Sequence, residues 1–270
     1  SYPEQAKLAG GEPVFVPTDP DRGFHLDLDA LARAVTPRTR AIVLNSPSNP
    51  TGAGLRRQEI EAVADLSRRH DLWVISDEIY EHLVYDGREH VSIAGLEGMK
   101  ERTILVNGLS KAFAMTGWRV GYAAAPRPVA EAMTAFQGHV THGLPGFIQA
   151  AAVAALQSPP ETVQAMVREY DRRRRYVVER LRSMPGVRCA EPEGAFYAFL
   201  DISALLGRQA GIGTDMDLAS HLLEEGRVAV VPGTGFGWPG ALRLSYATSM
   251  EQLQEGLDRM ERVFRALAGA

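Results

Sequence analysis

The first half of the chain alternates short apolar runs with segments in which apolar residues recur at helical spacing. Apolar side chains dominate residues 41–44, 72–75 and 103–106, and none of these segments alternates apolar with polar side chains. Between the first two runs, residues 60–66 repeat apolar side chains every three or four positions, as on one face of a helix. Strands without alternation, separated by helices, indicate an α/β fold with a mostly parallel sheet sandwiched by helices.

Other segments extend this pattern on both sides. The same signals predict a strand at residues 14–16, a helix at 28–35, a strand at 120–125, a helix at 145–156 and a long helix at 160–184. After the long helix, the sequence predicts a smaller α+β unit with strands near 187–190, 195–200, 228–231 and 242–246 and helices near 216–225 and 250–267. We therefore expect a large domain at residues 1–170 and a small C-terminal domain at residues 171–270.

Composition excludes several classes of protein. Hydrophobic residues make up 45% of the 270 residues and charged residues 23%, which is typical of a soluble globular protein with a sizeable core. The formal net charge of -4 gives no reason to expect nucleic acid or a membrane as a partner, and we predict neither. A single cysteine, Cys189, rules out an internal disulfide and fits a reducing compartment, so we expect a cytoplasmic protein.

Polar residues whose side chains can take part in chemical reactions follow three of the predicted strands. Asn49 follows the strand at 41–44, Asp77 closes the strand at 72–75, and Lys111 follows the strand at 103–106. In an open parallel sheet, ligands bind beyond the carboxyl ends of the strands. An amide, a carboxylate and an amine that lie far apart in the sequence are therefore expected to converge on one site.

These residue types match the needs of a pyridoxal-type cofactor. Such a cofactor needs an amine for its aldehyde, and here the amine is Lys111. It needs an anion beside its ring nitrogen, for which Asp77 is the candidate, and donors to its phenolate oxygen, for which Asn49 and Tyr80 are candidates. Its phosphate needs a cation or backbone N–H groups, and Arg119 is the candidate cation.

Each of these residues also has a purely structural interpretation. A lone lysine such as Lys111 is usually a solvated surface charge. Asp77 could cap a helix that begins near Glu78, Tyr80 could belong to the core, and Arg119 could form a structural ion pair. The ordered set, and no single member, favours the functional interpretation.

Four segments, in the same order, resemble the motifs of class I and II aminotransferases, the aspartate-aminotransferase-like group of fold type I pyridoxal-phosphate enzymes. Residues 45–52 (NSPSNPTG) look like the Asn-Pro-Thr-Gly signature of that family, and residues 76–80 (SDEIY) resemble its aspartate–tyrosine motif. Residues 110–122 (SKAFAMTGWRVGY) resemble the cofactor-lysine motif. Residues 242–247 (LRLSYA) resemble the segment with the substrate-carboxylate arginine.

The resemblance implies a role for each matching residue. Lys111 would hold pyridoxal 5'-phosphate as an internal aldimine and then move the proton at the substrate α-carbon. Asp77 would pair with the pyridine nitrogen, and Tyr80 and Asn49 would hydrogen-bond the phenolate oxygen. Lys111, Asp77 and Tyr80 are thus the implied catalytic residues, and no metal ligand is assigned.

The implied phosphate and substrate sites use other residues. Arg119 would bind the cofactor phosphate, with Ser110 as a further phosphate ligand. Many relatives carry a hydroxyl residue three positions before the lysine, where this sequence has Gly108 instead. Arg243 would hold the substrate carboxylate with a two-pronged contact, which a guanidinium suits better than an ammonium, and Asn49 would also lie at the substrate.

The predicted function is amino-group transfer between an α-amino acid and a 2-oxo acid, both of them small molecules. Two alternatives remain. A carbon–sulfur lyase would use the same lysine, aspartate and arginine. The ligand-sensing domain of a transcription regulator would place a DNA-binding segment before an aminotransferase-like domain.

Family members begin well before the point that matches Ser1, so the sequence resembles a family member that lacks its N-terminal part. In the family, the preceding part supplies a Gly-rich helix start for the phosphate, an aromatic ring that stacks on the cofactor, and part of the dimer contact. We therefore expect the parent protein to be a homodimer. We also expect residues 1–270 alone to be poorly stable and weakly active at best.

Overall fold

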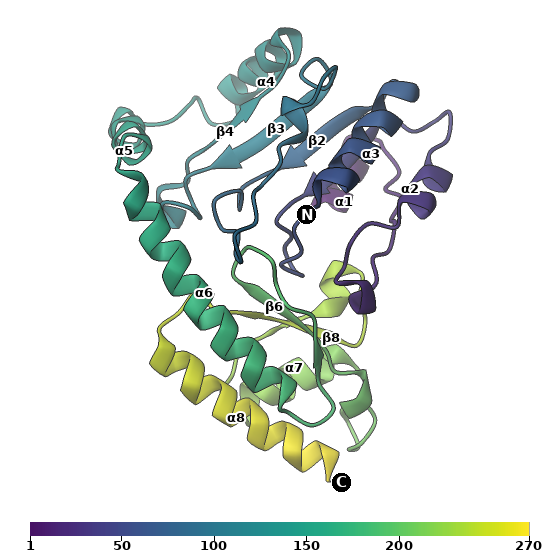
Figure 1. Ribbon diagram of the computed structural model, residues 1–270, viewed down its shortest axis with the longest axis vertical. Helices are drawn as coiled ribbons and strands as arrows, with labels where there is room; N and C mark the ends of the chain where they lie inside the picture. Colours follow the sequence, from purple (N-terminus) through teal and green to yellow (C-terminus); the bar gives the residue numbers. More distant parts are fainter. Residues whose placement is uncertain (270) are drawn as a thin grey trace. The chain divides into compact units, whose positions relative to one another are not determined.

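The computed structural model describes residues 1–269, which form two compact units (Figure 1). Unit 1 comprises Ser1–Pro47, Gly54–His82 and Glu89–Val163, and unit 2 comprises Ser48–Ala53, Leu83–Arg88 and Gln164–Ala270. Unit 1 ends and the last segment of unit 2 begins within the long helix α6 (Pro160–Arg182), the helix in which the sequence places the domain boundary. Sequence order did not indicate that the short segments 48–53 and 83–88 belong to unit 2.

Unit 1 is built on a four-stranded sheet in the order β1-β2-β3-β4. The strands are β1 (Ala41–Asn45), β2 (Trp73–Asp77), β3 (Thr103–Gly108) and β4 (Gly121–Ala124), and the helices are α1 (Tyr2–Leu8), α2 (Leu28–Ala34), α3 (Arg57–Arg69), α4 (Arg127–Val140) and α5 (Gly146–Leu156). The β1–β2 and β2–β3 pairs are parallel, and only β4 is antiparallel to its neighbour. The predicted α/β fold with a mostly parallel sheet is confirmed.

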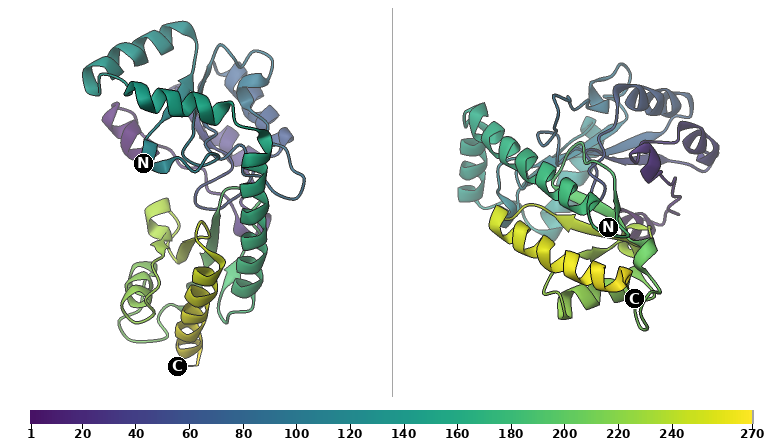
Figure 2. Two further views of the ribbon diagram at one scale, coloured as in Figure 1. Left: turned by 90° about the vertical axis from the view of Figure 1, so that its left-hand side faces the viewer. Right: turned by 60° about the horizontal axis from the view of Figure 1, so that its bottom comes forward.

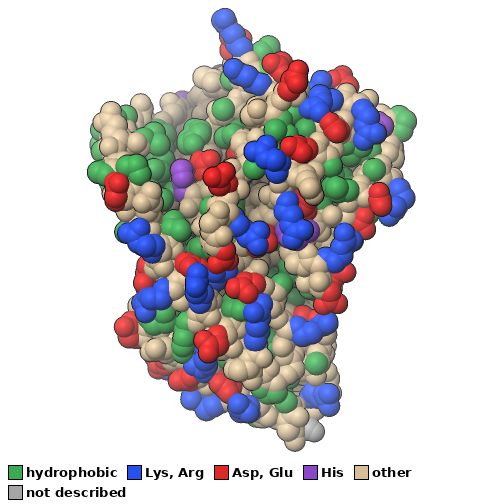
Figure 3. Space-filling view, in the orientation of Figure 1, with side chains coloured by type: hydrophobic (Ala, Val, Ile, Leu, Met, Phe, Trp, Pro, Cys, Tyr) green, Lys and Arg blue, Asp and Glu red, His purple; other side chains and the backbone are tan. Residues whose placement is uncertain are grey.

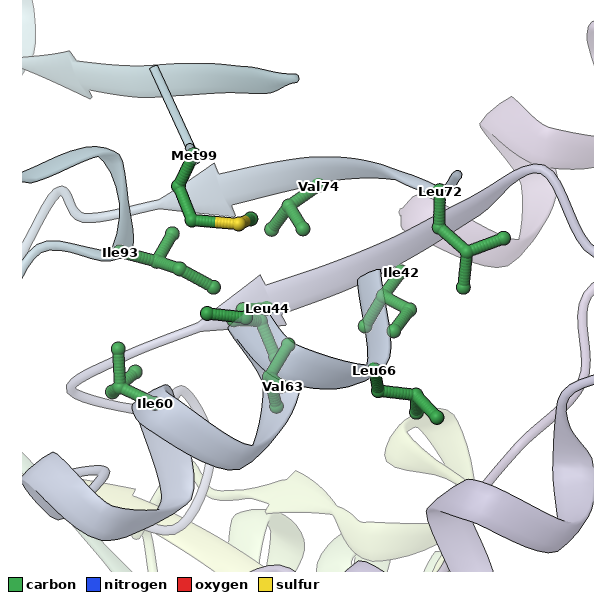
Figure 4. Close-up of a cluster of buried hydrophobic side chains, with 10 residues drawn as sticks. Ile42, Leu44, Ile60, Val63, Leu66, Leu72, Val74, Ile93 and Met99 are labelled. Carbon is green, nitrogen blue, oxygen red and sulfur yellow. The ribbon is translucent and has the colours of Figure 1, made fainter. Parts of the chain in front are cut away.

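Helices lie on both sides of this sheet. In the left view of Figure 2, α3 lies on one side of the sheet and α4 and α5 lie on the other. The α3 side holds the main core of the unit, in which apolar side chains of β1, β2 and α3 interlock (Figure 4). Its buried members are Ile42, Leu44, Ile60, Val63, Ala64, Leu66, Leu72, Val74, Ile93 and Met99.

The opposite side of the sheet is less well covered. Because side chains alternate along a strand, one residue in two points away from α3. Among these, Val43, Trp73 and Val106 are 37–44% exposed, one from each of β1, β2 and β3. The helices α4 and α5 contribute no buried residue of their own. The core of unit 1 is therefore concentrated on the α3 side.

The strand predicted at residues 14–16 is wrong. These residues form no strand, and Val14 and Phe15 are 68% and 67% exposed. Pro13 and Pro17 flank the segment and lack the N–H groups that a sheet ladder requires. The structure also contains two helices that the sequence pattern did not predict, α1 and α4.

Unit 2 has the smaller α+β architecture that the sequence predicts. An antiparallel sheet in the order β5-β6-β8-β7 is accompanied by α6, α7 and α8. Its elements after α6 are β5 (Arg188–Cys189), β6 (Tyr197–Asp201), α7 (Asp215–Glu224), β7 (Val231–Pro232), β8 (Ala241–Ser245) and α8 (Met250–Ala268).

A buried arginine explains why residues 83–88 belong to unit 2. Arg174 of α6 is 1% exposed and its guanidinium donates to Asp86, to Asp171 and to the backbone carbonyl of Pro192. A buried charge is tolerated only when it is paired and hydrogen-bonded. These contacts tie α6 to two segments that are distant in the sequence.

The surface mixes charges of both signs. Figure 3 shows Lys and Arg side chains interspersed with Asp and Glu on the face drawn, and hydrophobic side chains where α5 lies. Phe147 and Leu156 of α5 are 70% and 60% exposed, and Phe136 of α4 is 72% exposed. Among residues 1–269, no helix combines the length and the apolar character needed to span a bilayer.

Truncating a core side chain of unit 1 tests whether the α3 side of the sheet holds the packed core. Leu72 is 1% exposed, so Leu72→Ala is expected to lower the free energy of unfolding by about 2–5 kcal/mol in urea denaturation. Val43, on the other side of the same sheet, is 44% exposed, and Val43→Ala is the matched control, with an expected change below about 1 kcal/mol. Equal losses for both variants would contradict the assignment.

Candidate active site

The carboxyl ends of the three parallel strands lie at one edge of the sheet in unit 1. Asn45 at the end of β1 pairs with Asp77 at the end of β2, and Asp77 pairs with Val106 of β3. The Asn45 side-chain amide donates to the backbone carbonyl of Asp77 at 3.3 Å. Because the strands are parallel, their carboxyl ends share one edge, which is where open parallel sheets bind ligands.

Asp77 is held as a hydrogen-bond acceptor at this edge. The Tyr2 hydroxyl of α1 donates to one oxygen of its half-buried carboxylate, and the backbone N–H of Ile79 donates to the other oxygen at 3.1 Å. Burial raises the pKa of Tyr2, and the hydrogen bond to Asp77 and the charge of Asp77 raise it further, so the phenol keeps its proton. No helix begins at Glu78, so the Asp77 carboxylate caps a turn and not the start of a helix.

Tyr2 is a site residue that the sequence did not reveal. It lies 75 positions from Asp77, and no motif or spacing links the two residues. A tyrosine at the start of an amphipathic helix is usually a packing residue. Only the fold brings its hydroxyl to the carboxylate.

Lys111 lies in the loop that joins β3 to β4, beside the ring of Tyr80. Its ammonium is 5.9 Å from the ring centroid, and Tyr80 is 3% exposed. At this distance the amine is attracted by the ring face. The loop itself is closed by the hydrogen bond from Leu109 N–H to the Val120 carbonyl. The structure thus brings Lys111 and Tyr80 together, as the sequence predicts.

Ser110 and Arg119, the predicted phosphate ligands, lie in this same loop. The Thr116 hydroxyl donates to the Ser110 carbonyl at 2.9 Å, and the Arg119 guanidinium donates to the Thr116 carbonyl at 3.0 Å. Arg119 is exposed and has a left-handed backbone with φ of 55°. The contacts of both residues are local to the loop, so their role at a phosphate stays a prediction.

Close packing explains why glycine occupies position 108. Gly108 faces Gly121 across the β3–β4 pair. A Cβ atom on Gly108 would lie 3.0 Å from the Cα of Gly121 and 3.2 Å from the Cδ1 of Ile79. The hydroxyl residue that many relatives carry at this position would not fit without movement of the backbone.

The buried carboxylate next to Asp77 has a structural role. Glu78 is 1% exposed and accepts hydrogen bonds from the hydroxyls of Ser76 and Ser92 and from the ring of His90, at 2.8, 2.9 and 2.8 Å. Glu78, Glu81 and His90 have the ligand types of a metal site. Because both oxygens of Glu78 already accept hydrogen bonds, we assign this group to bracing the turn after β2.

In unit 2, the structure brings Asn49 and Arg243 together. The guanidinium of Arg243, on β8, donates to the side-chain oxygen of Asn49 at 2.8 Å. Asn49 is positioned because its loop is fastened to residues 192–194 of the same unit. The carbonyl of Gly52 accepts from the N–H groups of Glu193 and Gly194, both at 2.8 Å.

Arg243 also has a buried donor that is not used. Within residues 1–269, its Nε atom is buried and has no hydrogen-bond acceptor. An unsatisfied buried donor costs about 1–3 kcal/mol, and in a native structure it calls for an explanation such as a ligand, an ordered water or an ion. Nε and a terminal nitrogen form a planar fork of the kind that binds a carboxylate through two hydrogen bonds. The role of Arg243 as the ligand of the substrate carboxylate stays a prediction.

Each unit thus holds its own set of reactive groups. Unit 1 carries an amine, a carboxylate and a phenol on Lys111, Asp77 and Tyr80. Unit 2 carries the guanidinium of Arg243 with its amide partner Asn49. Groups of these types are suited to covalent attachment to an aldehyde, to pairing with a ring nitrogen and to binding a carboxylate.

Comparison with known proteins gives a consistent result. The family model for aminotransferase class I and II matches residues 1–260. The aspartate aminotransferase of Pyrococcus abyssi is 48% identical over 269 residues, which cover 98% of this chain and 67% of that protein. The aromatic-amino-acid aminotransferase 2 of Thermococcus litoralis is 46% identical, with the same coverage. The chain therefore spans about two thirds of the length of these relatives.

Solved structures agree. The aromatic aminotransferase of Pyrococcus horikoshii has a TM-score of 0.91 at 48% identity and covers 98% of this chain and 71% of its own. The aspartate aminotransferase of Rhizobium meliloti has a TM-score of 0.91 at 42% identity, covering 98% and 68%. The Thermus thermophilus aspartate aminotransferase with maleate has a TM-score of 0.87 at 43% identity, covering 97% and 67%.

The packing at Gly108 can be tested directly. Gly108→Ala is expected to lower the free energy of unfolding by about 1–3 kcal/mol, because the added Cβ crowds Gly121. Gly117, in the same loop, has nothing within 4 Å of an added Cβ, so Gly117→Ala should change stability by less than about 1 kcal/mol. Urea denaturation measures both variants, and a stable Gly108→Ala protein would contradict the packing argument.

Proposed function

The chain belongs to the aminotransferase class I and II family, and we propose that it uses pyridoxal 5'-phosphate, held by Lys111, to transfer amino groups between an α-amino acid and a 2-oxo acid. The observation that carries the cofactor assignment is the placement of Lys111 beside the buried ring of Tyr80, just beyond the end of β3. The relatives reported above are aminotransferases by name, which favours transamination over the carbon–sulfur lyase and over the sensor domain.

The residues present fit this cofactor. Lys111 supplies the amine that bonds the cofactor aldehyde, and Asp77 supplies a carboxylate whose two oxygens are oriented by Tyr2 and Ile79. When bound, the cofactor supplies an electron-withdrawing ring that makes the substrate α-carbon acidic. We assign the phosphate to Ser110 and Arg119, and the phenolate oxygen to Tyr80 and Asn49.

Side chains of the protein are assigned to proton transfer and to orientation of the substrate. The Lys111 amine is assigned to move the proton at the substrate α-carbon, because an amine is the suitable general base at this position. The negative charge of Asp77 would favour the protonated form of the ring nitrogen. Arg243 is assigned to bind and orient the substrate carboxylate.

Amino-group transfer from ¹⁵N-labelled amino acids to 2-oxo acids, followed by NMR with added pyridoxal phosphate, tests this function. Aspartate and aromatic amino acids are the first donors to try, since relatives are named for them. Lys111→Ala is expected to lower kcat by about 10²–10⁴-fold through loss of the general base. Lys100, also in unit 1, is exposed, and Lys100→Ala should retain activity. Equal activity in both variants would overturn the assignment.

Arg243→Lys tests the carboxylate site. A lysine keeps the positive charge but loses the planar fork, so KM for the amino acid is expected to rise by about 10–100-fold. Arg208 of unit 2 is exposed, and Arg208→Lys is the control that should leave KM unchanged. If KM were the same in Arg243→Lys and wild type, Arg243 would not be the carboxylate ligand.

We further propose that the parent protein is a cytoplasmic homodimer. The exposed apolar side chains of Phe136, Phe147 and Leu156 on α4 and α5 support an apolar contact with a second subunit. The single thiol of Cys189 is compatible with the cytoplasm. In light scattering, the parent protein is expected to have twice the mass of its own chain, and a mass equal to one chain would contradict a homodimer.

A further inference from the structure

Two aromatic rings contact the guanidinium of Arg243 in unit 2. The central carbon of the guanidinium is 4.5 Å from the ring centroid of Tyr197 and 5.1 Å from that of Phe236. Both distances are within the range in which a cation is attracted by an aromatic face. Together with the hydrogen bond to Asn49, these rings restrict the orientation of the guanidinium plane.

The position of Tyr197 follows from the register of the sheet. Arg243 of β8 lies opposite Phe199 of β6, and Tyr197 is two positions from Phe199 on the same face of that strand. Diagonal neighbours in an antiparallel pair are within reach of long side chains. Tyr197 is 6% exposed, so its ring is fixed by the core of the unit.

Phe236 comes from a separate turn, Gly233–Phe236, which a buried carboxylate holds in place. Asp215, the first residue of α7, is 2% exposed. One of its oxygens accepts from the backbone N–H of Thr234 and the other accepts from the Thr234 hydroxyl, both at 2.7 Å. Burial raises the pKa of Asp215, but hydrogen bonds from Thr234 and from the backbone N–H groups of Asp215 and Gly240 together lower it below its ordinary value, so the carboxylate is ionised at neutral pH.

The turn is also packed tightly against β8. A Cβ atom on Gly233 would lie 2.3 Å from the carbonyl oxygen of Trp238 and 2.8 Å from the Cβ of Ala241. The Phe236 ring meets the ring of Phe199 edge to face, at 6.2 Å and 87°. The close packing of Gly233 fixes the backbone of the turn, and the contact with Phe199 fixes the ring of Phe236. Two separate contacts therefore hold this turn.

We propose that Tyr197 and Phe236 form an aromatic clamp that sets the orientation of the Arg243 guanidinium for a substrate carboxylate, and that Asp215 and Thr234 position the Phe236 side of this clamp. This inference rests on the proposed role of Arg243. Tyr197, Phe236, Asp215 and Thr234 are positioning residues, because they act through the arginine. Neither the motifs nor the family resemblance assigns them a role.

The clamp has a defined energetic consequence. The guanidinium lies over the faces of both rings, and its Nε–H has no acceptor among residues 1–269, so this N–H is available to a carboxylate. Two rings next to the cation also lower the local polarity, which strengthens a hydrogen bond that the Nε–H makes. Loss of a ring is therefore expected to weaken carboxylate binding, with a smaller effect on the later proton transfer.

The test measures the Kd of maleate, a dicarboxylate without an amino group, by calorimetry on the cofactor-loaded protein. Phe236→Leu keeps an apolar side chain but removes the ring face, and Kd is expected to rise by about 2–30-fold. KM for the amino acid should rise by a similar factor, and kcat should change much less. Phe236→Tyr restores a ring and should restore the Kd, which separates loss of the ring from loss of folding.

The Asp215–Thr234 contact is tested with a matched pair of variants. Thr234→Val removes the hydroxyl donor and is expected to raise the Kd of maleate severalfold, whereas Thr234→Ser keeps the donor and should bind like wild type. Phe15 of unit 1 is 67% exposed and has no assigned role, so Phe15→Leu is the control for loss of an aromatic ring elsewhere and should not change the Kd.

The outcomes separate the clamp from the function on which it rests. If Arg243→Lys weakens maleate binding but Phe236→Leu and Thr234→Val do not, the clamp is wrong and the role of Arg243 stands. If Phe236→Leu lowers kcat at unchanged KM, the clamp is also wrong, because the ring then acts after binding. If Arg243→Lys itself leaves the Kd unchanged, both proposals are overturned.

Discussion

Parallel pairing of β1, β2 and β3 is the constraint on which the arrangement of unit 1 depends. It brings the ends of strands that are about 30 residues apart in sequence to one edge of the sheet, where Asp77 lies at the end of β2 and the Lys111 loop follows β3. The core on the α3 side stabilises this pairing, because β1 and β2 each bury alternate side chains there. The antiparallel strand β4 then returns the chain and closes the Lys111 loop between Leu109 and Val120.

In unit 2, the main constraint is to keep the guanidinium of Arg243 oriented in a partly buried position. A guanidinium that is removed from water must be compensated by neighbours. For Arg243 the neighbours are the side-chain oxygen of Asn49 and the faces of two rings, which leave its Nε donor without an acceptor in residues 1–269. This incomplete compensation distinguishes Arg243 from Arg174, whose guanidinium donates to carboxylates and to a carbonyl.

Sequence patterns predicted the fold well where local signals and tertiary pairing agree. The three buried runs became β1, β2 and β3, but the run at 14–16 has strand-forming residues and no partner strand. The site residues that follow strand ends could be named in advance, although their chemical roles stay predictions. Tyr2 and Phe236 could not, because a contact across 75 residues or between a turn and a sheet leaves no periodic signal.

The most direct test of the account is to identify the lysine that binds the cofactor. The chain has three lysines, Lys7, Lys100 and Lys111, of which the first two are exposed. Borohydride reduction after addition of pyridoxal phosphate, followed by peptide mass spectrometry, locates the modified side chain. We predict a single stoichiometric modification at Lys111 that a competing amino acid reduces. Modification of Lys7 or Lys100 to the same extent, or none at Lys111, would contradict the account.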